Sequence, residues 1–165
     1  VILPNNSNVI GTANQAAGES GKNVSVVPTK SMQAGVSALL AYSPQISAAE
    51  NQAAMDAAAS DVLVGSVTIA SRDFDLDGER VSSGAMIGLL GSEIVVSGDD
   101  LNEVAMNLLA RMSHRGELLT IYRGEAVAQQ EVEELGAAVS AQFGRLDVEI
   151  LDGGQPHYPL LIAVE

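Results

Sequence analysis

The 165-residue sequence contains no cysteine and no tryptophan, and only 3% of its residues are aromatic. The absence of cysteine excludes disulfide bonds, thiol catalysis and zinc sites with cysteine ligands. No apolar run approaches the about 20 residues that a membrane-spanning helix requires, and no signal-peptide pattern is visible. Hydrophobic residues nevertheless make up 47% of the chain and charged residues only 18%, which is typical of globular proteins. The composition therefore predicts a cytoplasmic protein without membrane insertion.

Basic residues are also scarce, because eight lysines and arginines face 21 aspartates and glutamates, for a net charge of −13. This balance argues against binding to nucleic acid or to an anionic membrane surface. The charge is unevenly spread: residues 1–45 hold one acid and two bases, whereas residues 46–165 hold twenty acids and six bases. The acidic part either keeps the protein soluble or forms a surface that binds a basic partner protein.

The first 45 residues show the order strand, helix, strand, helix, which predicts parallel strands with helical crossovers. Val1–Leu3 has the pattern of a buried strand, yet no element precedes it. Because a lone strand is unstable, we expect that earlier elements of this subdomain are missing. An Ala-rich helix is predicted over residues 8–20 and a second strand over residues 23–28. Ser31 begins another helix, with apolar residues along one side at Met32, Val36, Leu39 and Leu40.

The remaining residues, 46–165, predict a second α/β subdomain after the junction "SPQIS" at residues 43–47. A helix over residues 47–59 leads into an antiparallel meander of strands over residues 62–96. Two helices follow, over residues 100–115 and 128–143, and strands lie between and after them. The predicted fold is thus α/β with two small subdomains: a helix-covered remnant of a parallel sheet, and a mixed sheet covered by helices.

Three motifs suggest chemistry but are incomplete. "GESGK" at residues 18–22 lacks both the first glycine and the hydroxyl residue of a phosphate-binding P-loop. "DFDLDG" at residues 73–78 begins like a calcium loop, but its twelfth position is Gly84 instead of glutamate, so a hairpin turn is favoured. His114 and His157 lie in different elements without metal-ligand spacing. We therefore predict no catalytic residues, no metal and no cofactor for this chain.

Four segments occur in an order that resembles one family: "ILPNNSNVIGTANQAA", "VVPTKSMQAGVSALLAY", "VSGDDL" and the closing "DGGQPHYPLLIAVE". They are similar to the C-terminal, DegV-like region of the bacterial fatty acid kinase catalytic chain, in the dihydroxyacetone-kinase-like family, and the resemblance covers essentially the whole sequence. It implies a non-catalytic part of a kinase that makes acyl phosphate from ATP and a fatty acid. ATP and magnesium would bind in the kinase domain, and neither that domain nor the family's middle domain has a counterpart here.

The resemblance also implies two partners, the rest of the kinase chain and a DegV-like fatty-acid-binding protein. The binding protein would dock on a negatively charged surface, which favours recognition over solubility as the role of the acidic residues. The helix predicted over residues 128–143 buries one side and leaves glutamates on or near the other. The candidate docking residues are Glu125, Glu131, Glu133 and Glu134, together with Asp99, Asp100 and Glu103.

A second candidate site is the polar turn after the first strand, beside the turn after the second strand. Its residues are Asn5, Asn6, Ser7 and Asn8, with Thr29, Lys30 and Ser31. In the related acyl-binding proteins the equivalent turn holds the fatty-acid carboxylate, and free N–H groups at a helix start favour an anion. The alternative is structural, because the same residue types cap helices and tie loops together. An anion site, an acyl site and a purely structural turn all remain open.

Overall fold

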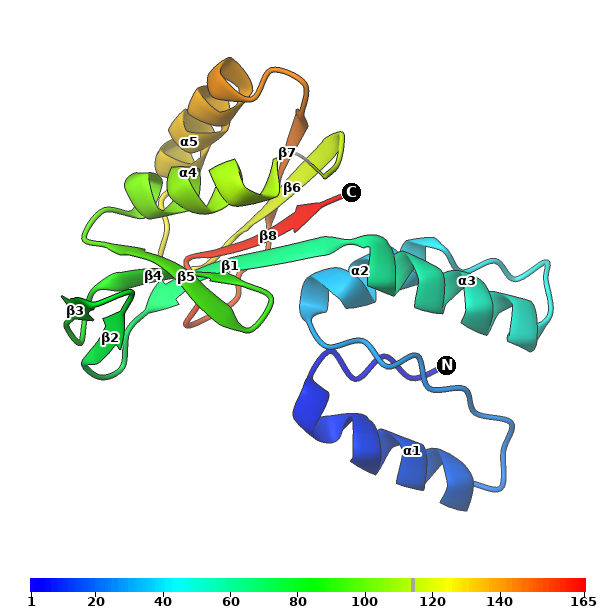
Figure 1. Cartoon of the computed structure of the whole chain (residues 1–165). Helices are drawn as coiled ribbons and strands as arrows, with labels where there is room; N and C mark the ends of the chain where they lie inside the picture. The colour runs from blue at the N-terminus through cyan, green and yellow to red at the C-terminus, as the bar shows by residue number, and fades with distance from the viewer. Residues whose placement is uncertain (114) are drawn as a thin grey trace. The chain divides into compact units, whose positions relative to one another are not determined.

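The computed structural model describes residues 1–113 and 115–165, so His114 lies outside the described residues. The chain forms two compact units, Val1–Val62 and Leu63–Glu165, which appear in blue to teal and in green to red (Figure 1). The sequence places the division after residue 45. In the structure the helix that follows this point packs against the preceding one and belongs to the first unit. Within the described residues, no helix is both long and apolar enough to cross a membrane.

The first unit contains a short 3-10 helix, η1 (Ser7–Val9), and the helices α1 (Ile10–Glu19), α2 (Met32–Leu40) and α3 (Ala48–Asp61). Its two extended segments meet in a parallel bridge between Ile2 and Val26. The N–H of Ile2 donates to the carbonyl of Ser25 at 2.8 Å, and the N–H of Val27 donates to the carbonyl of Ile2 at 3.0 Å. The predicted parallel order is therefore present, reduced to one bridge.

The core of the first unit is small and is built around alanines. Val27, Ala38 and Met55 are buried, and Leu3, Ala41 and Ala59 pack against them. Ala38 is fully buried, whereas Leu40 is 77% exposed. The inner face of α2 is thus its small-residue face, because short side chains let α2 and α3 approach closely. The apolar side predicted from the sequence lies elsewhere on this helix.

The second unit contains a six-stranded sheet in the order β5-β4-β1-β8-β6-β7. Neighbouring strands are antiparallel except β6 and β7, which are parallel. The predicted meander and the predicted mixed sheet are both confirmed. The strands are β1 (Leu63–Ile69), β4 (Met86–Leu90), β5 (Glu93–Gly98), β6 (Leu118–Arg123), β7 (Asp147–Asp152) and β8 (Leu160–Val164).

A separate hairpin of β2 (Phe74–Leu76) and β3 (Glu79–Val81) connects β1 to β4. Its turn residues Asp77 and Gly78 have φ values of 53° and 88°, which suit the Asp-Gly hairpin turn that the sequence predicts. Phe74, Leu76 and Val81 pack in a small cluster with residues of β4 and β5. The segment "DFDLDG" therefore forms a hairpin and not a helix-flanked calcium loop.

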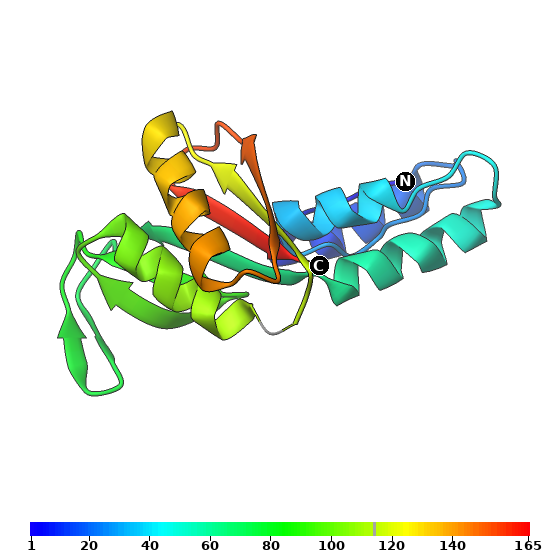
Figure 2. The ribbon, with the colours of Figure 1, turned by 90° about the horizontal axis from the view of Figure 1, so that it is seen from above.

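The helices α4 (Leu101–Met112) and α5 (Gln129–Gln142) cover one face of the sheet, side by side (Figure 2). Both contribute buried residues to the largest hydrophobic cluster of the unit. In α4 the apolar residues at i, i+3, i+7, i+8 and i+11 are buried, as the helical period requires. Asp100 caps α4 by accepting a hydrogen bond from the N–H of Glu103 at 2.9 Å, so the predicted start of this helix is confirmed.

Candidate functional site

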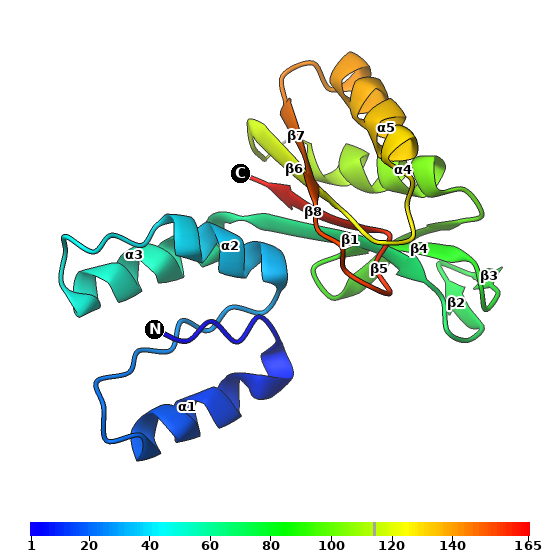
Figure 3. The ribbon, with the colours of Figure 1, turned by 180° about the vertical axis from the view of Figure 1, so that it is seen from behind.

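The strand directions bring several strand ends together at one end of the second unit. Because β4 and β8 run opposite to their neighbours, β1, β5, β6 and β7 all point the same way. Their carboxyl ends therefore meet at the same end of the sheet. The N-termini of α4 and α5 follow β5 and β6, and Figure 3 shows both helix starts together, near the β2–β3 hairpin.

This end of the unit is rich in carboxylates, and we call the following set of ten residues the acidic end. They are Asp73, Asp75, Asp77 and Glu79 on the hairpin, Asp99, Asp100 and Glu103 at the start of α4, Glu125 and Glu131 around the start of α5, and Asp152 at the end of β7. Three arginines, Arg72, Arg80 and Arg123, lie on the same segments. The second unit as a whole has seventeen acids and six bases, so most of its negative charge is gathered here.

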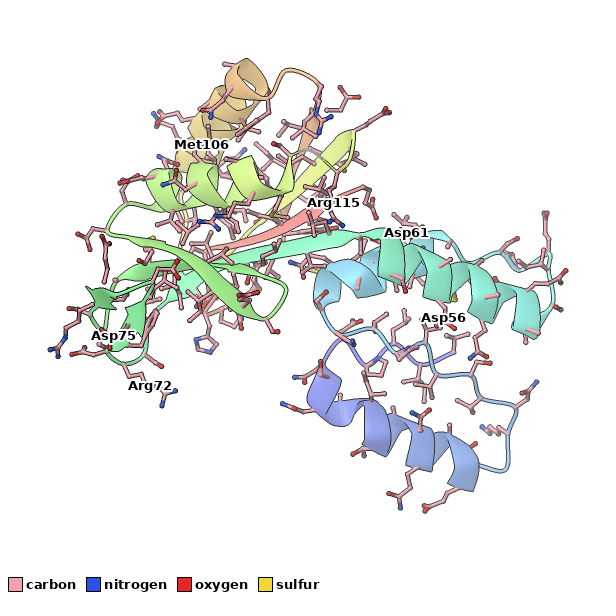
Figure 4. All side chains as sticks on the ribbon, in the orientation of Figure 1. Asp56, Asp61, Arg72, Asp75, Met106 and Arg115 are labelled. Atoms are coloured by element: carbon pink, nitrogen blue, oxygen red, sulfur yellow. The ribbon has the colours of Figure 1, made fainter. Side chains whose placement is uncertain are left out.

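The opposite end of the second unit has a different charge balance. Arg111 and Arg115 lie at and after the end of α4, and Arg145 precedes β7. Figure 4 shows this separation through its labelled side chains, with Arg72 and Asp75 at the hairpin and Arg115 at the far end of α4. The charges are thus segregated along the strand direction.

Two ion pairs stabilise the acidic end without neutralising it. A guanidinium N–H of Arg80 donates to Asp73 at 2.7 Å, and one of Arg123 donates to Asp152 at the same distance. The bond from Arg80, and then one from the backbone N–H of Ser83, lower the pKa of the Asp73 carboxyl below its usual value. Asp73 is therefore held in its charged form, while Asp75, Asp99 and Glu125 are exposed to solvent.

The loop of residues 153–159 closes this end of the sheet with a fixed conformation. The Gln155 side-chain amide donates to the carbonyls of Tyr122 and Tyr158, at 3.0 and 3.1 Å. The N–H of Gly124 donates to the carbonyl of Pro159 at 2.8 Å, and the Thr68 hydroxyl donates to the carbonyl of His157 at 2.7 Å. The "GGQP" segment is thus a structural latch beside the acidic end.

The structure groups five of the seven candidate docking residues and separates two. Asp99, Asp100, Glu103, Glu125 and Glu131 belong to the acidic end. Glu133 and Glu134 lie further along α5, exposed, and accept hydrogen bonds from Gln129 and Gln130 at 2.9 and 2.8 Å. Sequence reasoning did not include the hairpin acids or Asp152. The signal was the Asp-Gly turn between two meander strands, because a hairpin must extend from the sheet end where these strands meet.

In the first unit, Asn5 and Thr29 form a closed pair between the two turns. The N–H of Asn5 donates to the Thr29 hydroxyl oxygen at 3.0 Å, and this hydroxyl donates to Oδ1 of Asn5 at 2.8 Å. Thr29 is 1% exposed. Asn5 has a φ of 56°, a left-handed conformation that asparagine adopts more readily than most residues. Its amide rests on α2 at Gly35, where a Cβ would lie 2.6 Å from Cγ of Asn5.

The other turn residues divide into helix caps and exposed groups. Oδ1 of Asn6 accepts from the N–H of Asn8 at 2.8 Å and caps η1. The hydroxyl of Ser31 accepts from the N–H of Ala34 at 3.2 Å and caps α2. The side chains of Ser7, Asn8 and Lys30 belong to exposed residues. Four of the seven residues therefore have structural roles, and whether the turn binds a ligand stays a prediction.

Comparison with known proteins places this architecture in a family. The model of the FakA-like family, which describes the C-terminal part of fatty acid kinases of this type, matches residues 1–165. Protein YloV of Bacillus subtilis (strain 168) is 39% identical over 165 residues, which cover 99% of this chain and 30% of the relative. An uncharacterized protein of Staphylococcus haemolyticus is 37% identical over 166 residues, with 100% and 30% covered. The chain thus spans about 30% of the length of these relatives.

The fold also matches a solved structure. The crystal structure of a DegV family protein from Corynebacterium glutamicum superposes with a TM-score of 0.63 and 16% identity, covering 96% of this chain and 72% of the other. At this identity the likeness concerns the fold alone, and it confirms the DegV-like architecture expected from the sequence. The match of the family model over all 165 residues is the wider finding. The chain therefore belongs to the FakA-like C-terminal family of fatty acid kinases.

Proposed function

We propose that this chain is the non-catalytic C-terminal part of a fatty acid kinase and docks a DegV-like fatty-acid-binding protein through the acidic end. Membership of the family supports the first half of this proposal, since the chain spans about 30% of relatives such as YloV. In the proposal, ATP and magnesium bind to the remainder of the kinase polypeptide. The residues of this chain then contribute recognition, and not phosphoryl transfer.

The segregation of charge is the observation that carries the docking half of the proposal. A surface made acidic only for solubility has no reason to concentrate its carboxylates at one end. Here ten acids share the end where four strands finish and two helices begin, and only three arginines lie among them. A one-signed patch of this kind attracts a partner of the opposite sign and orients it on approach. The partner should therefore present a basic surface.

Some of these acids have a local role as well, which narrows the docking residues. Asp100 caps α4, and acids in the first turn of a helix are stabilised by its dipole. Asp73 and Asp152 are paired with arginines. Asp75, Asp99 and Glu125 are exposed and make no ion pair with a described residue. We expect these three to contribute most to steering.

The second candidate function is a small-molecule module that binds an anion at the polar turn. Ser7, Asn8 and Lys30 favour it, because they are exposed at the starts of η1 and α2 and offer donors and a positive charge. The closed Asn5–Thr29 pair weighs against it, because those hydrogen-bonding groups are already used.

Calorimetry separates the two functions. The chain is titrated with a DegV-like fatty-acid-binding protein, and in separate experiments with oleate and with inorganic phosphate. Docking predicts heat only with the protein partner, and the heat should not depend on Lys30→Ala. Binding of oleate or phosphate alone, abolished by Lys30→Ala, would instead establish the anion module.

A further inference from the structure

Helix α2 has apolar residues on all sides, although only one side packs inside the first unit. Residues 32–41, "MQAGVSALLA", contain no charged residue. Ala34 and Ala38 are buried, and Ala41 packs against the small core. Met32, Val36, Leu39 and Leu40 recur at i, i+4, i+7 and i+8 along another side, which we call the outer α2 face. A helix that is apolar all round is normally buried all round.

The outer α2 face is exposed at its C-terminal end. Leu39 is 59% exposed and Leu40 is 77% exposed, and the apolar surface continues at Tyr42, with 47%, and Ile46, with 41%. Of the ten large hydrophobic residues that are exposed among those described, six lie in Val1–Val62. This unit carries four acids and two bases, so its surface is apolar where that of the second unit is charged. Surfaces of this kind mark sites of protein association.

We propose that the outer α2 face packs against the segment of the longer kinase polypeptide that immediately precedes Val1. This inference rests on the proposed function, in which the chain is the C-terminal part of a longer protein. The relatives are about three times as long, and the matching family is a C-terminal one, so the remainder of such a polypeptide precedes Val1. The docked segment therefore needs apolar side chains spaced to fit Val36, Leu39 and Leu40.

The path of the chain into the first unit supports this occupant. Leu3 packs against the cluster that contains Ala38 of α2, and Ile2 bridges to Val26, five residues before the Ser31 cap of α2. Figure 3 shows the N terminus beside the pair formed by α2 and α3. A segment that leads into Val1 consequently arrives close to α2 and can fold over it without a long connection. Contiguity makes such contacts effectively intramolecular.

Hydrogen exchange tests the proposal on two proteins, the 165-residue chain and the longer polypeptide that ends in it. Burial of leucine side chains makes local opening of α2 less frequent, so its amides should exchange at least about tenfold more slowly in the longer protein. Leu40→Glu should remove this slowing. The matched control is Ala57→Glu on α3, which is also exposed and should leave the exchange of α2 unchanged. Circular dichroism of both variants in the 165-residue chain verifies folding.

The outcomes distinguish the occupants. Equal exchange of α2 in the two proteins would overturn the proposal. Protection that rises with concentration of the 165-residue chain would assign the face to a second copy instead. Binding of the fatty-acid-binding protein is measured on Leu40→Glu as well, and it should persist, because that docking surface lies in the second unit. Loss of docking with normal α2 protection would contradict the proposed function and leave this inference intact.

Discussion

Gly35→Ala provides a sharp test of the polar turn, because two physical effects oppose each other at this position. Alanine in place of glycine favours a helix by about 1 kcal/mol. The new Cβ, however, would lie 2.6 Å from Cγ of Asn5 and even nearer to its amide oxygen. The Asn5 side chain must then leave α2, and Thr29 loses the acceptor of its hydroxyl hydrogen bond.

The magnitude follows from the burial of Thr29. Because Thr29 is 1% exposed, its hydroxyl donor cannot turn to water, and a buried unsatisfied group costs about 1–3 kcal/mol. In an Asn5→Ala background nothing collides with the new methyl group, so Gly35→Ala should stabilise the chain by about 1 kcal/mol. In the wild-type background the two effects should cancel or leave a net loss of up to about 2 kcal/mol.

A double-mutant cycle measures the coupling directly. Urea unfolding of the wild type, both single variants and the double variant gives four free energies of unfolding. The left-handed strain of alanine at position 5 is the same in both backgrounds and drops out of the coupling energy. We expect a coupling of about 1–3 kcal/mol between positions 5 and 35. A value below about 0.5 kcal/mol would mean that Asn5 does not hold Thr29, and would return the turn to the ligand-binding hypothesis.

Three further predictions concern the second unit. Gly124→Ala should lower the free energy of unfolding by more than about 2 kcal/mol, since its Cβ would collide with the backbone carbonyls of Tyr158, Pro159 and Gln155; an unchanged urea midpoint would contradict the latch. Burial, and then the charges of Glu165 and Glu149, raise the pKa of Tyr122, so its contribution to stability is complete below about pH 10 and is lost as the pH rises through the raised pKa. Tyr122→Phe should flatten this alkaline loss in unfolding curves. Reversal of Glu131, Glu133 and Glu134 to lysine should preserve the fold and slow association with the fatty-acid-binding protein; a normal rate would make them a solvated helix face.

The sequence predicts well the elements whose apolar residues are large and strictly periodic. In α4, Leu101, Val104, Leu108 and Met112 are all buried, because one helix face has a sheet to cover. In α2 the same rule selects the outer face, and the structure buries Ala34 and Ala38 instead. Periodicity gives large side chains the greater weight, but close packing of helices requires small ones.

The candidate sites were predictable as residues and not as an arrangement. Each acid of the acidic end is visible in the sequence, yet its grouping depends on strand order, which is decided by long-range pairing such as that of β1 with β8. The cap roles of Asn6 and Ser31 follow from residue type at a helix start. The pairing of Asn5 with Thr29 joins residues 24 positions apart, so local patterns could not reveal it.

The most direct measurement of the central claim is the association rate of the chain with a DegV-like fatty-acid-binding protein, at 0.1 M and 1 M salt. The test variant reverses Asp75, Asp99 and Glu125 to lysine. The control reverses Glu93, Glu117 and Asp147, which are exposed at the opposite end of the sheet, so both variants change the net charge equally. Screening lengths fall from about 10 Å to about 3 Å between these salt concentrations. We predict association that is slowed about tenfold or more by high salt and by the test variant, and much less by the control. Equal rates in both variants, or a rate indifferent to salt, would contradict docking at the acidic end.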